Sequence, residues 1–154
     1  MRNRIYICSL LVLLVLYLAS CQSLDEKLTK KTRIQDIPNS EESLTIESNK
    51  ERYKVPVKKV VLVINNATNM DTDFNQFATI EKKKSGDWYP VPIKAGQSID
   101  AAGRALNANR ESNVTFPLEH LDEELDPGQY RIVVGFSHKE SSFQLATPFE
   151  VVEN

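Results

Sequence analysis

Cysteine is almost absent from this sequence, and both copies lie within the first 21 residues. Cys8 lies inside an apolar stretch, and Cys21 lies just beyond its end. The chain after Cys21 contains no cysteine, which excludes a disulfide bond within that part. If this part is exported, its stability must therefore come from side-chain packing, without the covalent cross-links that support many small secreted domains.

Histidine and glycine are also scarce, at two and five residues. His120 and His138 lie in no His-Glu-x-x-His pattern and no Cys/His pairing that would bind zinc. The loop at Asn69–Asp73 resembles a calcium loop, but Phe74 stands where a glycine is required. The glycines form no loop that cradles phosphate. We predict no catalytic residue, no metal ligand and no cofactor except a covalent lipid.

Basic residues do not dominate the charge, since 19 Lys and Arg stand against 21 Asp and Glu. Without Arg2 and Arg4, which precede the apolar stretch, the balance is 17 basic against 21 acidic residues. A mildly acidic chain argues against nucleic-acid binding, which needs a basic face. It also argues against attachment to an anionic membrane through charge alone.

The apolar stretch runs from Ile5 to Leu18, about 14 residues, whereas a permanent membrane-spanning helix needs about 20. It follows a basic start and precedes two small residues, as in a secretory leader; an uncleaved membrane anchor is the alternative. Its end resembles the lipobox of bacterial lipoproteins, carried by Leu18, Ala19, Ser20 and Cys21. The resemblance implies that residues 1–20 are a signal peptide and that Cys21 carries a diacylglyceryl group. We expect an exported, lipid-anchored protein at the cell membrane or outer membrane, according to whether its host has one membrane or two.

Residues 21–43 are polar, and their apolar side chains are too sparse to mark an amphipathic helix. We predict a flexible tether, about 25 Å long as a random coil. A helical turn around Leu24–Lys31 is the alternative.

From residue 44 the pattern changes to period two, which indicates β-strands. Val60–Ile64 is a continuous apolar run, as expected for a central strand buried on both faces. Residues 44–154 are predicted to form an all-β antiparallel sandwich of about seven strands. The expected strands are Leu44–Glu47, Val55–Val57, Val60–Ile64, Phe77–Lys83, Asp87–Ile93, Asn113–Leu118, Gly128–Ser137 and Phe149–Val151.

Two aromatic residues add detail to this sandwich. Pro127 and Gly128 turn the chain, and Tyr130 follows just inside the next strand, which is the placement of a tyrosine corner. In such a corner the phenol bonds to backbone a few residues upstream. Trp88 follows a hairpin turn and is expected to fill the core between the sheets.

Three segments taken in order resemble a family of bacterial immunoglobulin-like domains: Ile80–Pro92, Pro127–Ile132 and Phe149–Val151. The resemblance covers about residues 55–152. It implies an immunoglobulin-like sandwich that acts as a binding module or as a spacer, because this fold does not by itself imply catalysis. The family commonly has a Pro-Gly turn where this chain has Asn107–Arg110, so the conformation of the Ala95–Glu111 loop stays open.

The leading hypothesis is a non-enzymatic envelope module that binds a protein or an envelope polymer, but no nucleic acid. Loops are the expected binding surface, with Asn65–Asn75 and Ala95–Arg110 as first candidates. One alternative is an inhibitor that inserts Ala95–Arg110 into an exported protease. Another is an enzyme with an unrecognised site, which requires His120 or His138 in a pocket with carboxylates.

Overall fold

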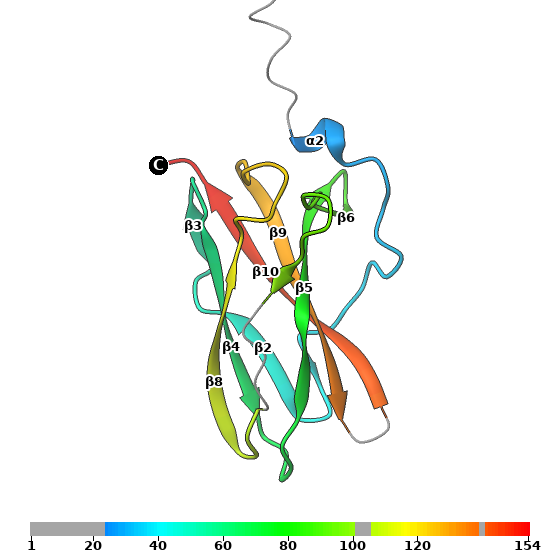
Figure 1. Ribbon diagram of the computed structural model, residues 1–154, viewed down its shortest axis with the longest axis vertical. Helices are drawn as coiled ribbons and strands as arrows, with labels where there is room; N and C mark the ends of the chain where they lie inside the picture. Colours follow the sequence, from blue (N-terminus) through cyan, green and yellow to red (C-terminus); the bar gives the residue numbers. More distant parts are fainter. Residues whose placement is uncertain (1–23, 101–105, 139–140) are drawn as a thin grey trace, which may run out of the picture.

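The computed structural model describes residues 24–100, 106–138 and 141–154. Two β-sheets pack face to face around one core (Figure 1), which confirms the predicted all-β sandwich. Its elements are α2 (Leu24–Lys27), β1 (Ser40–Glu41), β2 (Leu44–Ser48), β3 (Arg52–Lys54), β4 (Lys59–Asn66), β5 (Asp73–Lys84), β6 (Asp87–Pro90), β7 (Ile99–Asp100), β8 (Arg110–Pro117), β9 (Gly128–His138) and β10 (Ser141–Val152).

One sheet has four strands in the order β1-β2-β4-β8, and all its neighbours are antiparallel. The other has the order β3-β10-β9-β5-β6, with β7 paired to β5. In this sheet β3 pairs with β10 in parallel, while the other pairs are antiparallel. The seven strands of four or more residues match the predicted number.

Alternating side chains from both sheets fill the core. On β4, Val60, Leu62 and Ile64 are buried, whereas Val61 and Val63 are only half-buried. The prediction of a strand buried on both faces was therefore wrong, because only one face of the β4 sheet meets the other sheet. On β9 the predicted alternation is correct, with its inward side chains fully or almost fully buried: Tyr130, Ile132, Val134 and Phe136.

Some strand limits differ from those expected. The expected strand at Val55–Val57 lies instead at Arg52–Lys54, and the short last strand is the end of the twelve-residue β10. The predicted hairpin is present between β5 and β6, where Ser85 and Gly86 both have positive φ angles, of 52° and 91°.

Trp88 does not fill the core, and that prediction was wrong. It lies on β6, the last strand of its sheet, where it is half-buried. Its ring contacts the Arg131 guanidinium, with 4.7 Å between the ring centroid and Cζ. On the adjacent strands β5 and β9, Ile80 and Ile132 face the core, while Glu81 and Arg131 face outward. Because the Trp88 ring contacts Arg131, Trp88 belongs to the outer face of the sheet.

Candidate functional site

Residues 24–39, which we call the strap, pack against the sandwich instead of forming the predicted flexible tether (Figure 1). Leu24 and Leu28 join the main core, each with 4% of its surface exposed. Of the helical turn considered as the alternative, around Leu24–Lys31, the residues Leu24–Lys27 are helical. Further along, the Ala146 amide donates to the Pro38 carbonyl at 2.8 Å. The strap therefore runs from one end of the sandwich across the outer face of the six-stranded sheet.

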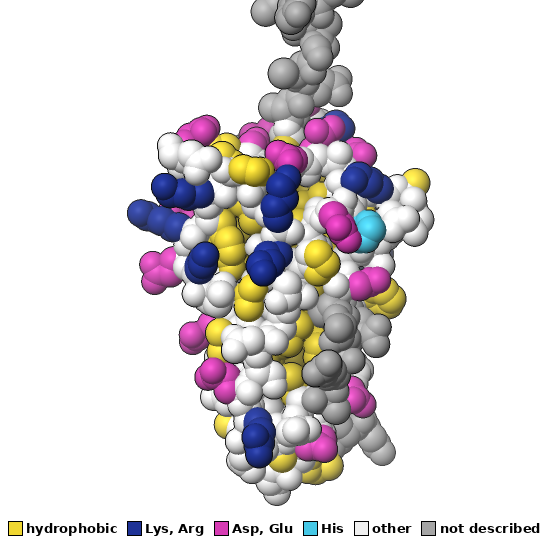
Figure 2. Space-filling model, turned by 60° about the vertical axis from the view of Figure 1, so that its left-hand side comes forward, with side chains coloured by type: hydrophobic (Ala, Val, Ile, Leu, Met, Phe, Trp, Pro, Cys, Tyr) yellow, Lys and Arg dark blue, Asp and Glu magenta, His cyan; other side chains and the backbone are white. Residues whose placement is uncertain are grey.

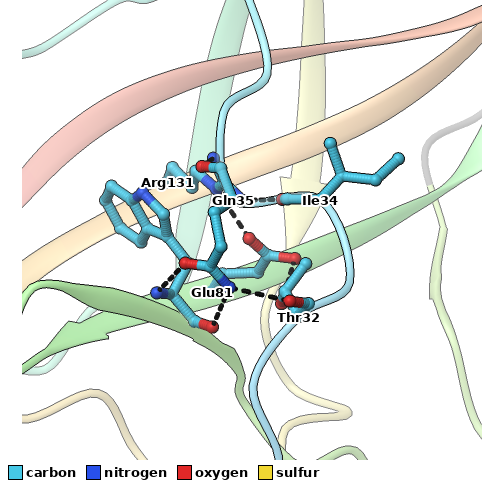
Figure 3. Close-up of polar contacts among 6 residues, drawn as sticks. Thr32, Ile34, Gln35, Glu81 and Arg131 are labelled. Carbon is cyan, nitrogen blue, oxygen red and sulfur yellow. Dashed lines mark hydrogen bonds and ion pairs between the residues drawn. The ribbon is translucent and has the colours of Figure 1, made fainter.

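Arg131 and Glu81 form the centre of the contact between strap and sheet (Figure 3). Both side chains are 4% exposed, and Arg131 Nε lies 2.6 Å from Glu81 Oε2. The two terminal guanidinium nitrogens of Arg131 donate to the carbonyls of Gln35 (2.7 Å) and Ile34 (2.8 Å). One buried cation thus binds the sheet and the strap together.

Thr32 and Gln35 complete this polar cluster. Thr32 Oγ1 donates to Glu81 Oε1 at 2.7 Å, so both carboxylate oxygens of Glu81 are satisfied. Gln35 Oε1 accepts from the Trp88 amide at 2.7 Å, and Gln35 Nε2 donates to the Trp88 carbonyl at 3.2 Å. The strap therefore covers the open edge of β6, a strand edge that is otherwise free to pair with another chain.

A second polar cluster joins α2 to the tyrosine corner. Lys82 is nearly buried, and its Nζ lies 2.7 Å from both Asp25 Oδ1 and Asp126 Oδ1. Burial lowers the pKa of Lys82, but the hydrogen bonds that its ammonium donates to Asp126 and Asp25 outweigh this effect, so the pKa lies above its ordinary value. Burial likewise opposes ionisation of Asp126, yet the bonds from Lys82 and Tyr130 hold its pKa below the usual range. The charged forms of Lys82 and Asp126 are thus both favoured.

The residues of the predicted corner, Pro127, Gly128 and Tyr130, lie beside this cluster. The Tyr130 hydroxyl lies 2.8 Å from the Asp126 carbonyl oxygen and 2.6 Å from Asp126 Oδ1, so both acceptors are within reach of its proton. Burial raises the pKa of Tyr130 and keeps it a neutral donor. At Gly128 a Cβ would stand 3.0 Å from Lys82 Cε, so a side chain there would disturb the cluster.

At the other end of the sandwich, Asn66 joins the two loops that are the first candidates for binding, Asn65–Asn75 and Ala95–Arg110. Asn66 is fully buried at the end of β4. Its Nδ2 donates to the carbonyls of Met70, Leu106 and Asn107, at 2.9 to 3.2 Å. Its Oδ1 accepts from the Thr68 amide and hydroxyl. One buried amide therefore holds the described parts of these loops together, and this role of Asn66 has no recognisable motif in the sequence.

Several predicted site residues cannot be placed. The lipobox residues Leu18, Ala19, Ser20 and Cys21 lie outside the described residues, as does the loop segment 101–105. His120 is half-exposed, with Nε2 3.6 Å from the neighbouring Glu119 carboxylate. Within residues 24–100, 106–138 and 141–154, no three His, Cys, Asp or Glu side chains gather as metal ligands. No helix in those ranges has the length and apolarity needed to cross a membrane.

Comparison with known families places most of the sandwich in one of them. A family model described as a bacterial Ig-like domain matches residues 40–150. A comparison with curated proteins gives no match.

Among solved structures, three similar chains illustrate the fold. They are the E. coli chaperone DraB (12% identity, TM-score 0.47), a chain of the CsuC–CsuE chaperone–tip adhesion subunit complex of Acinetobacter baumannii (13%, 0.45), and the Pseudomonas fluorescens DNA glycosylase AlkC (11%, 0.43). The matches cover 72%, 72% and 73% of this chain. They cover 55%, 57% and 31% of the other chains, so this chain spans less than two thirds of each. Similarity at this level is limited to the fold.

Proposed function

We infer that this chain, which belongs to the bacterial Ig-like domain family, is a non-enzymatic binding or structural module held at the cell surface by lipid on Cys21. The Ig-like sandwich fits such a module, because this architecture presents loops on a rigid core and has no inherent chemistry. The lipobox pattern at Leu18–Cys21 supports the anchor.

The observation that carries the proposal is the docked strap. Leu24 is buried in the core, and only Gln22 and Ser23 separate it from Cys21. The three steps from Cys21 to Leu24 span about 10 Å at most. A lipid on Cys21 would therefore hold the α2 end of the sandwich against the headgroups. A flexible coil of about 20 residues would instead let the domain move freely.

The same geometry directs the opposite end away from the membrane. Figure 1 shows α2, the β5–β6 turn and the C-terminus at one end, and the β4–β5 connection at the other. The far end carries the loops joined by Asn66. One residue of these loops, Met70, is 45% exposed. We propose this far end as the surface that meets a protein or polymer of the envelope.

Labelling with a radioactive fatty acid tests the anchor. The wild-type protein should incorporate label, whereas Cys21→Ala should not and should keep its leader, because the acylated thiol directs cleavage. Equal labelling of the two proteins contradicts the anchor.

Energy transfer to a membrane dye tests the orientation. A donor attached at Ser85→Cys, in the β5–β6 turn, should transfer efficiently to a dye in the bilayer, and one at Asn69→Cys should transfer weakly. Equal transfer from both positions contradicts a fixed orientation.

Crosslinking in intact envelopes tests the far-end surface. Met70→Glu should lose a crosslinked partner, while Ile34→Glu, the same change at a 53% exposed strap residue, should keep it. Equal recovery of the partner by both variants rules out the far end as the binding surface.

A further inference from the structure

Residues 50–59 are strongly basic, although the chain as a whole has a small net negative charge. Five of these ten residues are basic and only Glu51 is acidic, although the chain as a whole carries more acidic than basic groups. The segment forms β3 and the approach to β4. The basic residues are Lys50, Arg52, Lys54, Lys58 and Lys59.

All five basic residues line one cavity of about 610 Å³, which we call the basic groove. Tyr53, Pro56 and Val61 are among its other lining residues, and no carboxylate of the described chain lines it. Figure 2 shows Lys and Arg side chains gathered around a hydrophobic area on the upper half of this face. A groove lined by charges of one sign concentrates ligands of the opposite sign, so this groove is suited to an anionic ligand.

Three of the five cations have no anionic partner among the described residues. Arg52 pairs with Glu150 at 2.8 Å, and Lys58 pairs with Glu124 at 2.7 Å. Lys54, Lys59 and Lys50 form no ion pair with a described carboxylate, and the Lys50 ammonium lies 6.0 Å from the centroid of the Tyr53 ring. Like charges gathered in this way repel one another and cost stability until an anion neutralises them.

We propose that the basic groove binds a linear polymer that carries repeated phosphate groups. Four of the five cations are lysines, whose ammonium groups bind phosphate as point charges from many directions. The single guanidinium pairs with Glu150, so the two-bond recognition that arginine offers to carboxylate or phosphate is taken up by this chain's own carboxylate. Arg52 and Lys54 are both exposed on β3 and lie roughly 7 Å apart along it, which suits a chain with regularly repeated charges.

The shape of the site favours a flexible chain over a membrane surface. The groove is concave, whereas a bilayer surface is flat, and it lies on a side face of the sandwich in the half that carries α2 and the C-terminus. The proposal concerns a different face from the far-end loops, and it depends on neither the lipid anchor nor those loops.

Fluorescence anisotropy with labelled inorganic polyphosphate tests this proposal on the full chain in non-ionic detergent micelles. Wild-type protein should bind, and its affinity should fall as salt increases, because bound phosphates release counterions. Lys54→Gln with Lys59→Gln should weaken binding by about fivefold per lysine and reduce the log–log salt slope by about two.

The matched control is Lys30→Gln with Arg33→Gln, which removes two positive charges from exposed residues of the strap. This control should bind polyphosphate as the wild type does. If the groove variant also binds as the wild type does, the groove is not the site, and if the wild type does not bind polyphosphate at all, the proposal fails.

Competition identifies the source of the anion. Free phosphate, polyglutamate and micelles containing phosphatidylglycerol should each compete poorly with polyphosphate. Equal competition by polyglutamate overturns the assignment to phosphate. Stronger competition by the lipid micelles than by free polyphosphate overturns the assignment to a polymer.

Discussion

Replacing Arg131 by methionine should lower the free energy of unfolding by about 3–5 kcal/mol, the usual cost of removing one partner from a buried ion pair. Methionine has a similar length but no charge. The change leaves the Glu81 carboxylate in a site where it is 4% exposed, with only the Thr32 hydroxyl as a donor. It also removes the donors to the Ile34 and Gln35 carbonyls, and with them the centre of the strap contact.

The expected loss is large compared with the total stability of an ordinary domain, about 5–15 kcal/mol. Urea unfolding can be followed by the fluorescence of Trp88, the only tryptophan, and by far-ultraviolet circular dichroism. Using both is necessary because Trp88 contacts Arg131, so its signal also reports the strap. Coincident transitions would show that the strap and the sandwich unfold together.

Two further variants make this prediction refutable. Arg52→Met removes an exposed ion pair with Glu150 and should change stability by less than about 0.5 kcal/mol. The double variant Arg131→Met with Glu81→Met leaves neither charge alone, so its loss should be smaller than the sum of the two single losses. If Arg131→Met costs no more than Arg52→Met, or if the two buried changes are additive, the proposed coupling between strap and sheet is wrong.

Three other predictions concern the same end of the molecule. Leu24→Ala should cost about 2–5 kcal/mol in a urea melt because this side chain is buried, while Ile34→Ala, at an exposed strap residue, should cost little; a flexible tether would make both changes silent. Tyr130→Phe should cost about 1–2 kcal/mol by removing the hydroxyl that bonds to Asp126, and a change near zero would contradict that bond's role. Because the folded-state pKa of Asp126 is below 3.8, its ionisation contributes stability above pH 3.8 that is lost as pH falls through the folded value. The stability difference between wild type and Asp126→Asn should therefore shrink in acid, and a difference that grows in urea melts at decreasing pH would refute this sign.

The strands could be predicted because their signal is local. Alternation along Gly128–His138 reports which side chains face the core, and the Ser85–Gly86 turn marks the β5–β6 hairpin. The register of Tyr130 after Pro127 and Gly128 likewise depends on a few adjacent residues. Such features need no knowledge of distant parts of the chain.

The strap could not be predicted, because its apolar residues follow no period and its partners are remote in sequence. Arg131 contacts Gln35 across 96 positions, and Lys82 contacts Asp25 across 57. Trp88 was misplaced for a related reason, since its preference for a core says nothing about whether β6 is central or at an edge. The five cations of residues 50–59 were visible in the sequence, but the net charge of the chain obscured them.

The sequence by itself determined the sandwich, the hairpin and the position of Tyr130, since each follows from the chemistry of neighbouring residues. It also contains the lipobox pattern that ends at Cys21, which predicts an anchor without describing what the anchor holds. Only the tertiary structure decided that residues 24–39 belong to the folded domain, because their burial depends on partners supplied by β5, β6 and β9. That placement sets which end of the sandwich a lipid on Cys21 would hold at the membrane, and which end it would leave free.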